Sequence, residues 1–545
     1  MASQKNFAIT PSVSISRSKF RRPSQHKTSF NLGDIVPIYC DADILPGDTV
    51  SLDLASLVRM STPIAPIMDN IFVDYYAFFV PNRLLWDNWK KFMGENDSAA
   101  GAVNSEPAYP VSLINGYTIY QLTSGCLGDY LGLPVGLAPV SNATDPNAVS
   151  VSRLPGMAYL LTYSEWFRDQ NLIAPIVINK SSNGQGVLGT QGGTSFGYGS
   201  SLLKAAKESD YFTRGLPFAQ KGSPVSLPLG SLAPVVGCDA GVHVDVPAGT
   251  TLNIGTGNAT TAANPQTNIY GNDPLPGSGA VLQLFTDLST ATAATINQLR
   301  FAFQYQKFLE KDALYGTRYW EILKGHFGIT APDASLQRPE LLGHFRQHIN
   351  IDQVLQTSES GSTALGTPGA NSVSGKSEHL ISKSFVEHGV LLILAVARHE
   401  QTYGQGINRM WSRTHRTDFY FPVFANLGAQ EIKNKEIYAV GNNNTQNNSV
   451  FAYQEAWAEY RYKPSIVTGL LNPSVSPSLS FWDLANNFGS LPTLSQSFIE
   501  QDRTNLSRAL VTGANGPDFI ADFYFDAVYV RPMPMYSIPG LIDHH

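Results

Sequence analysis

Nine consecutive apolar residues, GVLLILAVA, occupy Gly389–Ala397 and form the longest strongly apolar run in the chain. A helix of nine residues is too short to span a bilayer, so we expect no membrane insertion. A short, continuous apolar run is typical of a strand that is buried on both faces. The N-terminus also lacks the apolar segment of a secretory signal peptide, so we expect a soluble protein that is not secreted by the usual route.

Other strand-like segments are spread widely along the chain. They are rich in β-branched and aromatic residues, at residues 34–60 (broken at Pro37 and at Leu45–Asp48), 70–81, 418–425, 451–464 and 518–532. Helices are predicted only at Leu154–Gln170, at Thr295–Gly316 with a capping box of Thr295 and Gln298, and at Thr317–Gly328. Distant strands separated by long insertions predict a β-sandwich with elaborated loops.

A region without cations interrupts this pattern. No lysine or arginine occurs in the 78 residues between Lys221 and Arg300, and the middle of the region is rich in Thr, Asn, Gly and Pro. We predict an insertion at residues 237–294, whose surface can hydrogen-bond to glycans or simply stay hydrated. The lack of cations argues against DNA contact there. A second cation-free run, Phe92–Ser152, shows that such an absence is not unique in this chain.

The N-terminus has the opposite character. Residues 1–30 hold six basic residues and no acidic one, although the whole chain carries a net charge of −6. Without them, 31 basic and 43 acidic residues remain, a formal charge of −12. Serine and basic residues dominate this segment, so we predict a flexible cationic arm over residues 1–30.

No motif indicates catalysis or a bound cofactor. The pattern of Gly184, Gly186 and Gly189 matches a dinucleotide fingerprint, but the glycine-rich segment after it cannot begin the required helix, so a loop is predicted. The P-loop and nucleophile-elbow motifs are absent. We therefore predict no enzyme activity and no cofactor.

No metal site is predicted either. His344 and His348 have helical metal-ligand spacing but lack a third ligand, and His388 and His399 flank the apolar strand at opposite ends. Surface or interface histidines are the simpler interpretation. The chain has three widely separated cysteines, Cys40, Cys126 and Cys238, which fit neither a disulfide framework nor a zinc motif and are expected to be buried small side chains.

A cluster of arginine and aromatic side chains lies at Gly406–Pro422. It contains Arg409, Trp411, Arg413 and Arg416. Arginine beside an aromatic ring suits a platform for single-stranded nucleic acid. The same composition is typical of a contact between subunits. Both interpretations remain open from the sequence.

Long blocks of the chain resemble the major capsid protein of microviruses, in the gokushovirus-like branch of these small single-stranded-DNA bacteriophages. The resemblance rests on segments that include SKFRRPSQHKTSFNLGDIVPIY, DILPGDTVSLDLASLVRMSTPIAPIMDNIFVDYYAFFVPNRLLWDNWKKFMGE, QLRFAFQYQKFLEKDALYGTRYWEILKGHFG, GINRMWSRTHRTDFYFPVFANLG and RPMPMYSIPGLIDHH. These blocks occur in the family's order and span nearly the whole chain.

The resemblance implies a mainly β fold, an eight-stranded antiparallel viral jelly roll with long loops and a few helices. Residues 31–236 and 295–545 would form the shell domain, and residues 237–294 a protrusion at the threefold axis. It also implies a small icosahedral shell with one copy per asymmetric unit, which encloses circular single-stranded DNA and is assembled in the cytoplasm of a bacterial host. Implied partners are further copies of the chain, a small internal DNA-binding protein, a DNA pilot protein and a bacterial receptor.

In that setting the arm is expected to face DNA through Arg17, Lys19, Arg21, Arg22 and Lys27. A clamp on a neighbouring subunit is the competing expectation. The alternative for the whole chain is a soluble glycan-binding or hydrolytic β-sandwich, with the insertion as its ligand-binding face. Formation of particles would distinguish these two classes.

Overall fold

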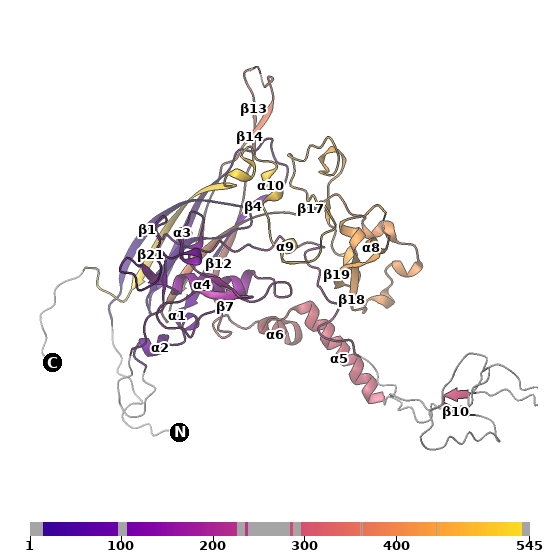
Figure 1. Ribbon diagram of the computed structural model, residues 1–545, viewed down its shortest axis with the longest axis horizontal. Coiled ribbons are helices and arrows are strands. Elements are labelled where there is room, and N and C mark those ends of the chain that lie inside the picture. Colours follow the sequence, from indigo (N-terminus) through magenta and orange to yellow (C-terminus); the bar gives the residue numbers. More distant parts are fainter. Residues whose placement is uncertain are drawn as a thin grey trace, which may run out of the picture. The chain divides into compact units, whose positions relative to one another are not determined.

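The computed structural model describes residues 15–95, 106–225, 235–237, 284–286 and 296–536, apart from residues 360, 362 and 443. The chain divides into two compact units, Met1–Lys221 with Lys311–His545, and Gly222–Glu310 (Figure 1). The predicted insertion, residues 237–294, falls within the second unit, and all but four of its residues lie outside the described ones. The first unit contains both of the large sheets.

One antiparallel sheet contains the first and the last strand of the described chain. Its strands are β1 (Ser18–Phe30), β21 (Phe519–Arg531), β3 (Thr49–Met60) and β15 (Ser374–Ser384), in that spatial order. β1 pairs with β21 over its whole length, from Ser18 opposite Arg531 to Phe30 opposite Phe519. Side chains alternate between buried and more exposed along β21 and β3, so this sheet has one buried and one exposed face.

In the second sheet the two central strands are buried on both faces. Its strands are β12 (Glu340–His348), β4 (Ile71–Pro81), β16 (Gly389–His399) and β2 (Ile35–Ile44), in that order. Every side chain from Val390 to Ala397 is fully buried, which confirms the prediction made from the apolar run. α4 (Leu154–Thr162) and the π-helical turn Tyr163–Phe167 pack on its outer face, where Trp166 contacts Phe78 with 5.5 Å between ring centroids.

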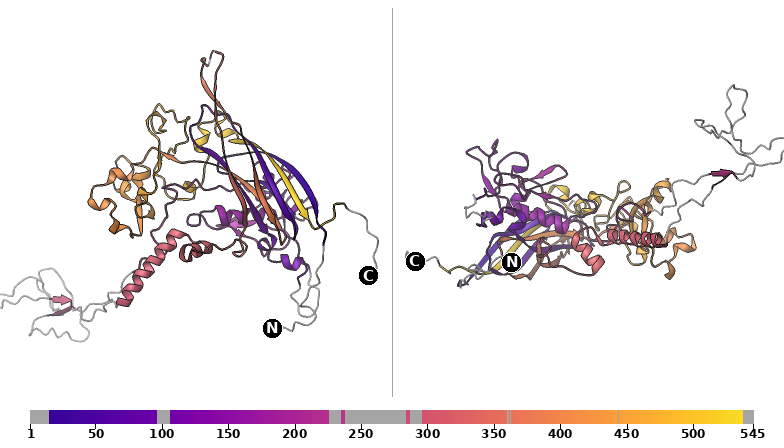
Figure 2. Two further views of the ribbon diagram at one scale, coloured as in Figure 1. Left: turned by 180° about the vertical axis from the view of Figure 1, so that it is seen from behind. Right: turned by 90° about the horizontal axis from the view of Figure 1, so that it is seen from below.

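The inner faces of the two sheets form one core (Figures 1 and 2). The rings of Tyr75 on β4 and Phe523 on β21 lie 5.9 Å apart. The buried Gln347 side chain accepts hydrogen bonds from Ser56 (2.6 Å) and Tyr75 (2.8 Å), so these three polar groups inside the sandwich are paired. The fold is therefore mainly β, with antiparallel sheets and few helices.

The prediction of a flexible arm is wrong for residues 18–30, which form β1. Alternate residues of β1 turn inward, and the buried Phe30 stacks on Phe519 with 5.4 Å between centroids. Pro23 is tolerated because β1 is an edge strand, and Pro37 does not break β2 for the same reason. The polar, cationic composition of the outward face concealed this strand in the sequence.

The helix predictions are confirmed by α4 with its π-helical turn, by α5 (Ile296–Tyr315) and by α6 (Tyr319–Phe327). The capping residue Thr295 lies outside the described residues. The strand predicted at 418–425 is wrong, because the single turns η4 (Arg416–Asp418) and η5 (Pro422–Phe424) occupy it. The strand predicted at 451–464 is present only as β19 (Val450–Glu455). It stops before Trp457, whose φ of 67° cannot continue a strand.

The remaining elements are short. They are α1 (Asn82–Leu85), α2 (Trp89–Phe92), β5 (Val111–Leu113), η1 (Thr118–Tyr120), α3 (Leu127–Tyr130), β6 (Ser150–Ser152), β7 (Val177–Ile178), β8 (Gly189–Gln191), β9 (Thr194–Phe196), β10 (Val235–Gly237), β11 (Leu284–Thr286), β13 (Asp352–Leu355), β14 (Pro368–Asn371), β17 (Thr402–Tyr403), η3 (Arg409–Ser412), β18 (Ala429–Lys433), α7 (Asn434–Ile437), α8 (Asn444–Asn448), η6 (Ala458–Tyr460), β20 (Ser465–Ile466), η7 (Gly469–Leu471), α9 (Gln496–Ile499), α10 (Thr504–Ser507) and η8 (Gly513–Asn515). Among the described residues, no helix is both long and apolar enough to cross a bilayer.

Candidate nucleic-acid and subunit interfaces

Two of the five predicted DNA-facing cations are engaged within the chain. Arg21 donates to both carboxylate oxygens of Asp526, at 2.8 and 2.6 Å, on the exposed face of its sheet. Arg22 points to the other side of β1, where it donates to Asp41 at 2.9 Å and lies 5.0 Å from the centre of the Tyr529 ring. Alternation along the strand thus separates these neighbouring arginines onto opposite faces.

The other three cations, Arg17, Lys19 and Lys27, are exposed, and none has an ion pair with the part of the chain that is described. Lys19 and Lys27 lie on the same face of β1, because they are eight residues apart. That spacing places them roughly 26 Å apart along an extended strand. The structure therefore does not gather the five cations into one cluster.

Arg22 belongs to a hydrogen-bonded network at the edge of the core. The Tyr529 hydroxyl donates to Asp41 at 2.6 Å and lies 2.9 Å from the Tyr39 hydroxyl. Burial, with Tyr39 and Asp41 nearby, raises the pKa of Tyr529 well above its ordinary value. The phenol thus stays protonated as a donor. The network anchors β1 to β2 and β21, so the role of Arg22 is structural.

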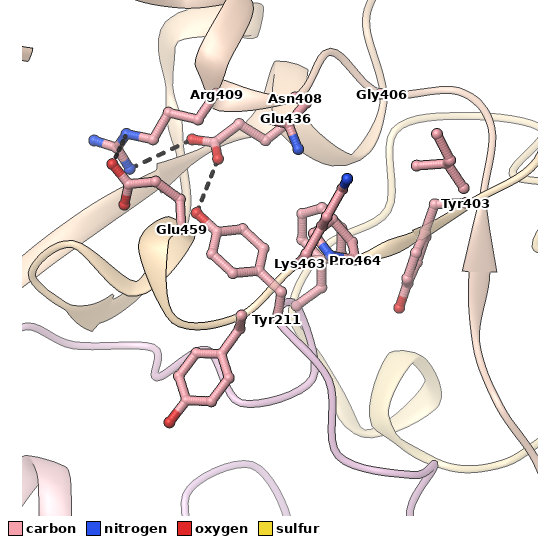
Figure 3. A pocket seen from close by; sticks show the side chains of 12 residues that line it. Tyr211, Tyr403, Gly406, Asn408, Arg409, Glu436, Glu459, Lys463 and Pro464 are labelled. Carbon is pink, nitrogen blue, oxygen red and sulfur yellow. Dashed lines mark hydrogen bonds and ion pairs between the residues drawn. The ribbon is translucent and has the colours of Figure 1, made fainter. Parts of the chain in front are cut away.

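The cluster at 406–422 is also divided by the structure. Arg409 points into a cavity of about 70 Å³, with its guanidinium 3.7 Å from both Glu436 and Glu459 (Figure 3). The Tyr211 hydroxyl donates to Glu436 at 3.0 Å, and burial raises the pKa of that carboxyl. The cavity holds a few water molecules at most. Arg409 therefore belongs to an internal network of charges, and the cavity beside it has no room for a nucleotide.

Arg413 likewise contributes to the fold, since it lies 3.6 Å from Glu459 and its guanidinium sits over the Tyr460 ring at 4.6 Å. Trp411 and Arg416 remain exposed. Trp411 is 75% exposed, and other exposed apolar side chains of this region are Met410, Phe419, Val423 and Leu427. An apolar surface of this kind favours contact with protein over contact with phosphates.

Neither of the two histidine pairs forms a metal site within the described residues. His344 and His348 lie on strand β12 rather than on a helix, and His388 and His399 lie at opposite ends of β16, as predicted. Within the described ranges, no group of three or more metal-ligating side chains occurs. The glycine pattern at 184–189 lies in a loop that leads into β8, so no helix comes after it, as predicted.

Sequence reasoning missed a buried charge cluster on β4. Asp74 is fully buried and accepts from Arg346 at 2.7 and 3.1 Å and from Arg398 at 3.0 Å, with His344 at 3.4 Å. The two arginines come from β12 and β16, so the cluster joins three neighbouring strands of the second sheet. The one signal in the sequence is a single carboxylate inside the apolar segment IFVDYYAFFV.

Comparison with known proteins is decisive for the identity of the chain. The model of a phage family described as "Capsid protein (F protein)" matches residues 8–541. The chain belongs to this capsid protein family.

Its relatives agree with the family. Capsid protein VP1 of Bdellovibrio phage phiMH2K is 40% identical over 98% of both chains. Capsid protein VP1 of Chlamydia phage 1 and that of Spiroplasma virus 4 are each 36% identical, over 98% of this chain and 97% of their own. The resemblance to microvirus capsid proteins is thus confirmed, and this protein is a major capsid protein of the virion with a structural role in its shell.

Proposed function

We propose that the two four-stranded sheets of this capsid protein are a viral jelly roll. Numbered one to eight along the chain, the long strands are ordered 1-8-3-6 in one sheet and 2-7-4-5 in the other. The pairs 1–8, 2–7, 3–6 and 4–5 are the successive rungs of one folded ribbon, and they alternate between the sheets. Rolling up such a ribbon generates the double Greek key of a jelly roll.

This capsid protein, we propose, builds a small icosahedral shell with one copy per asymmetric unit around a circular single-stranded DNA genome. The observation that carries the proposal is the full-length match to the capsid family, together with the strand order. A shell of identical copies closes through heterologous contacts repeated under symmetry.

Electron microscopy of the expressed or phage-derived protein, combined with nuclease digestion of the extracted genome, tests this proposal. We expect closed particles whose nucleic acid is degraded by a nuclease specific for single-stranded DNA. A chain that stays monomeric, or particles that contain duplex DNA, would contradict it. The glycan-binding or hydrolytic alternative would instead be supported by glycan hydrolysis or binding by a monomer.

We propose that the exposed cations at and just before the start of β1 contact DNA. Arg17 and Lys19 have no acidic partner among the described residues, so their charges are available to phosphates. Arg21 and Arg22 are largely neutralised by Asp526 and Asp41, so they contribute less. Lys27 lies beside an apolar groove and suits protein contact, which agrees with the second expectation for the arm, a clamp on a neighbouring subunit.

The same setting accounts for the other predicted partners. We propose that the insertion at 237–294 protrudes from the shell at the threefold axis and contacts a bacterial receptor. A small internal DNA-binding protein and a DNA pilot protein complete the virion, which assembles in the host cytoplasm. Deleting the insertion should therefore abolish adsorption to host cells while leaving particle formation intact.

A further inference from the structure

A two-stranded hairpin extends beyond the end of the sandwich. β13 and β14 pair with each other and contact no third element of the described chain extensively. Figures 1 and 2 show this hairpin projecting past the strands from which it emerges. An isolated hairpin of this size is marginally stable in water. It is therefore a candidate for stabilisation by something outside the chain.

The base of the hairpin is fixed, so its direction is defined. The Asn350 backbone N–H donates to the Ser374 hydroxyl at 2.7 Å, and the Ser372 hydroxyl donates to the Asn350 carbonyl at 2.7 Å. Beyond this base the side chains are exposed and partly apolar. Val354 and Leu355 are each 51% exposed, and Leu365 is 67% exposed.

The hairpin is also purely acidic. Between Arg346 and Lys376 the chain has no lysine or arginine, and its carboxylates are Asp352 and Glu359. Both carboxylates are exposed and have no ion pair within the described residues. A partner for this segment should therefore offer an apolar surface with cations at its edge.

Such a surface exists on the exposed face of the sheet formed by β1, β21, β3 and β15. A shallow groove of about 530 Å³ has Leu57, Ile520 and Pro517 in its lining. Lys27 and Arg59 also line it, and neither has an ion pair in the described structure. Asp522 is the one carboxylate of the lining, and it accepts from the Gln25 amide.

We infer that the hairpin of one capsid subunit docks in this groove of a second copy. Leu365 and its apolar neighbours would cover Leu57 and Ile520, while Asp352 and Glu359 would face Lys27 and Arg59. The charge complementarity and the matching apolar surfaces select a copy of this chain over DNA, which would be repelled by the hairpin carboxylates.

Both features lie at the same end of the sandwich, because β15 begins there opposite the last residues of β3. A hairpin that reaches from each copy to the next at one common end generates a ring around a rotation axis. The contact is thus of the kind that a closed shell can repeat. The inference rests on assembly of the capsid protein into a shell.

Reciprocal charge reversal tests the inference. The variants K27E/R59E and D352K/E359K should each lower particle yield about tenfold or more, because like charges then meet across the contact. The four side chains are exposed and unpaired in the described structure, so the soluble variants should unfold at the wild-type urea concentration. The chain that carries all four reversals should recover most of the yield. Wild-type yields from both reversed pairs, or no recovery in the quadruple variant, would overturn the inference.

Cross-linking identifies the occupant directly. Copies that carry Leu365→Cys are co-expressed with copies that carry Ile520→Cys, and particles are oxidised. We expect a dimer that contains one copy of each variant. The matched control replaces Leu365→Cys with Val386→Cys, another highly exposed position in the β15–β16 turn, and should give no such dimer. Particles without the dimer would overturn the docking but leave the shell function intact, whereas wild-type protein that forms no particles would overturn the function itself.

Discussion

Replacement of Asp74 by Asn should destabilise the subunit strongly, because it removes the only carboxylate that reaches the guanidinium of Arg398 in the described structure. The Arg398 side chain is 11% exposed, and that of Arg346 is 34% exposed. Removing one partner of a buried ion pair typically costs about 3–5 kcal/mol. Arg346 keeps Glu208 at 3.3 Å and Arg398 keeps the Ala206 carbonyl at 3.0 Å, so we expect about 3 kcal/mol.

The assay is urea unfolding of unassembled subunits, monitored by tryptophan fluorescence. Asp53→Asn is the matched control, because Asp53 also has a histidine partner, His379 at 2.6 Å, but both side chains are more than half exposed. A solvent-exposed pair contributes about 1 kcal/mol or less, so the control should stay close to wild type. The double variant D74N/R398M should recover part of the loss, because the stranded charge is removed as well. If D74N and D53N lower the unfolding free energy equally, the assignment of Asp74 to a buried three-strand cluster is refuted.

Three further predictions concern other parts of the subunit. Burial lowers the pKa of His399 from 6.5 to about 4, so between these pH values the unfolded chain binds a proton that the folded chain does not bind. The free energy of unfolding should therefore fall as the pH drops from 6.5 towards 4, by up to about 3 kcal/mol. In a pH series of urea titrations, His399→Gln should flatten this part of the profile. The variant R17Q/K19Q should reduce the salt slope of binding to a single-stranded oligonucleotide by about 1.4, whereas an unchanged slope would contradict DNA contact by these cations. Gly33→Ala should lower the urea midpoint of unfolding, because Gly33 has a φ of 82° and an added methyl group would collide with the Gln501 carbonyl. A midpoint equal to that of the wild type would contradict the tight turn between β1 and β2.

The core strands could be predicted from the sequence because burial on both faces leaves a direct pattern. Val390–Ala397 is uniformly apolar, and it is uniformly buried. The helix at Ile296–Tyr315 was likewise evident from its spacing. By contrast, β1 looks disordered in the sequence, because its pairing partner β21 lies about 500 residues away and only this long-range ladder makes the segment a strand.

The candidate site was less predictable for a related reason. Arg22 and Arg409 are indistinguishable in the sequence from arginines available to DNA. Their carboxylate partners, Asp41 for Arg22 and Glu436 with Glu459 for Arg409, are brought to them by the fold. Counting the cations in the sequence therefore overestimates the positive charge that is available to phosphates. The difference is the charge that is neutralised by ion pairs formed in the folded chain.

A particle reconstruction by electron cryomicroscopy tests the central claim most directly. We predict a closed icosahedral shell with one copy of the chain per asymmetric unit, in which strands follow the orders β1-β21-β3-β15 and β12-β4-β16-β2 within a single subunit. Density for β13 and β14 should lie against the groove of a neighbouring copy. A shell whose subunits show a different strand order, or protein that forms no closed shell, would contradict the account.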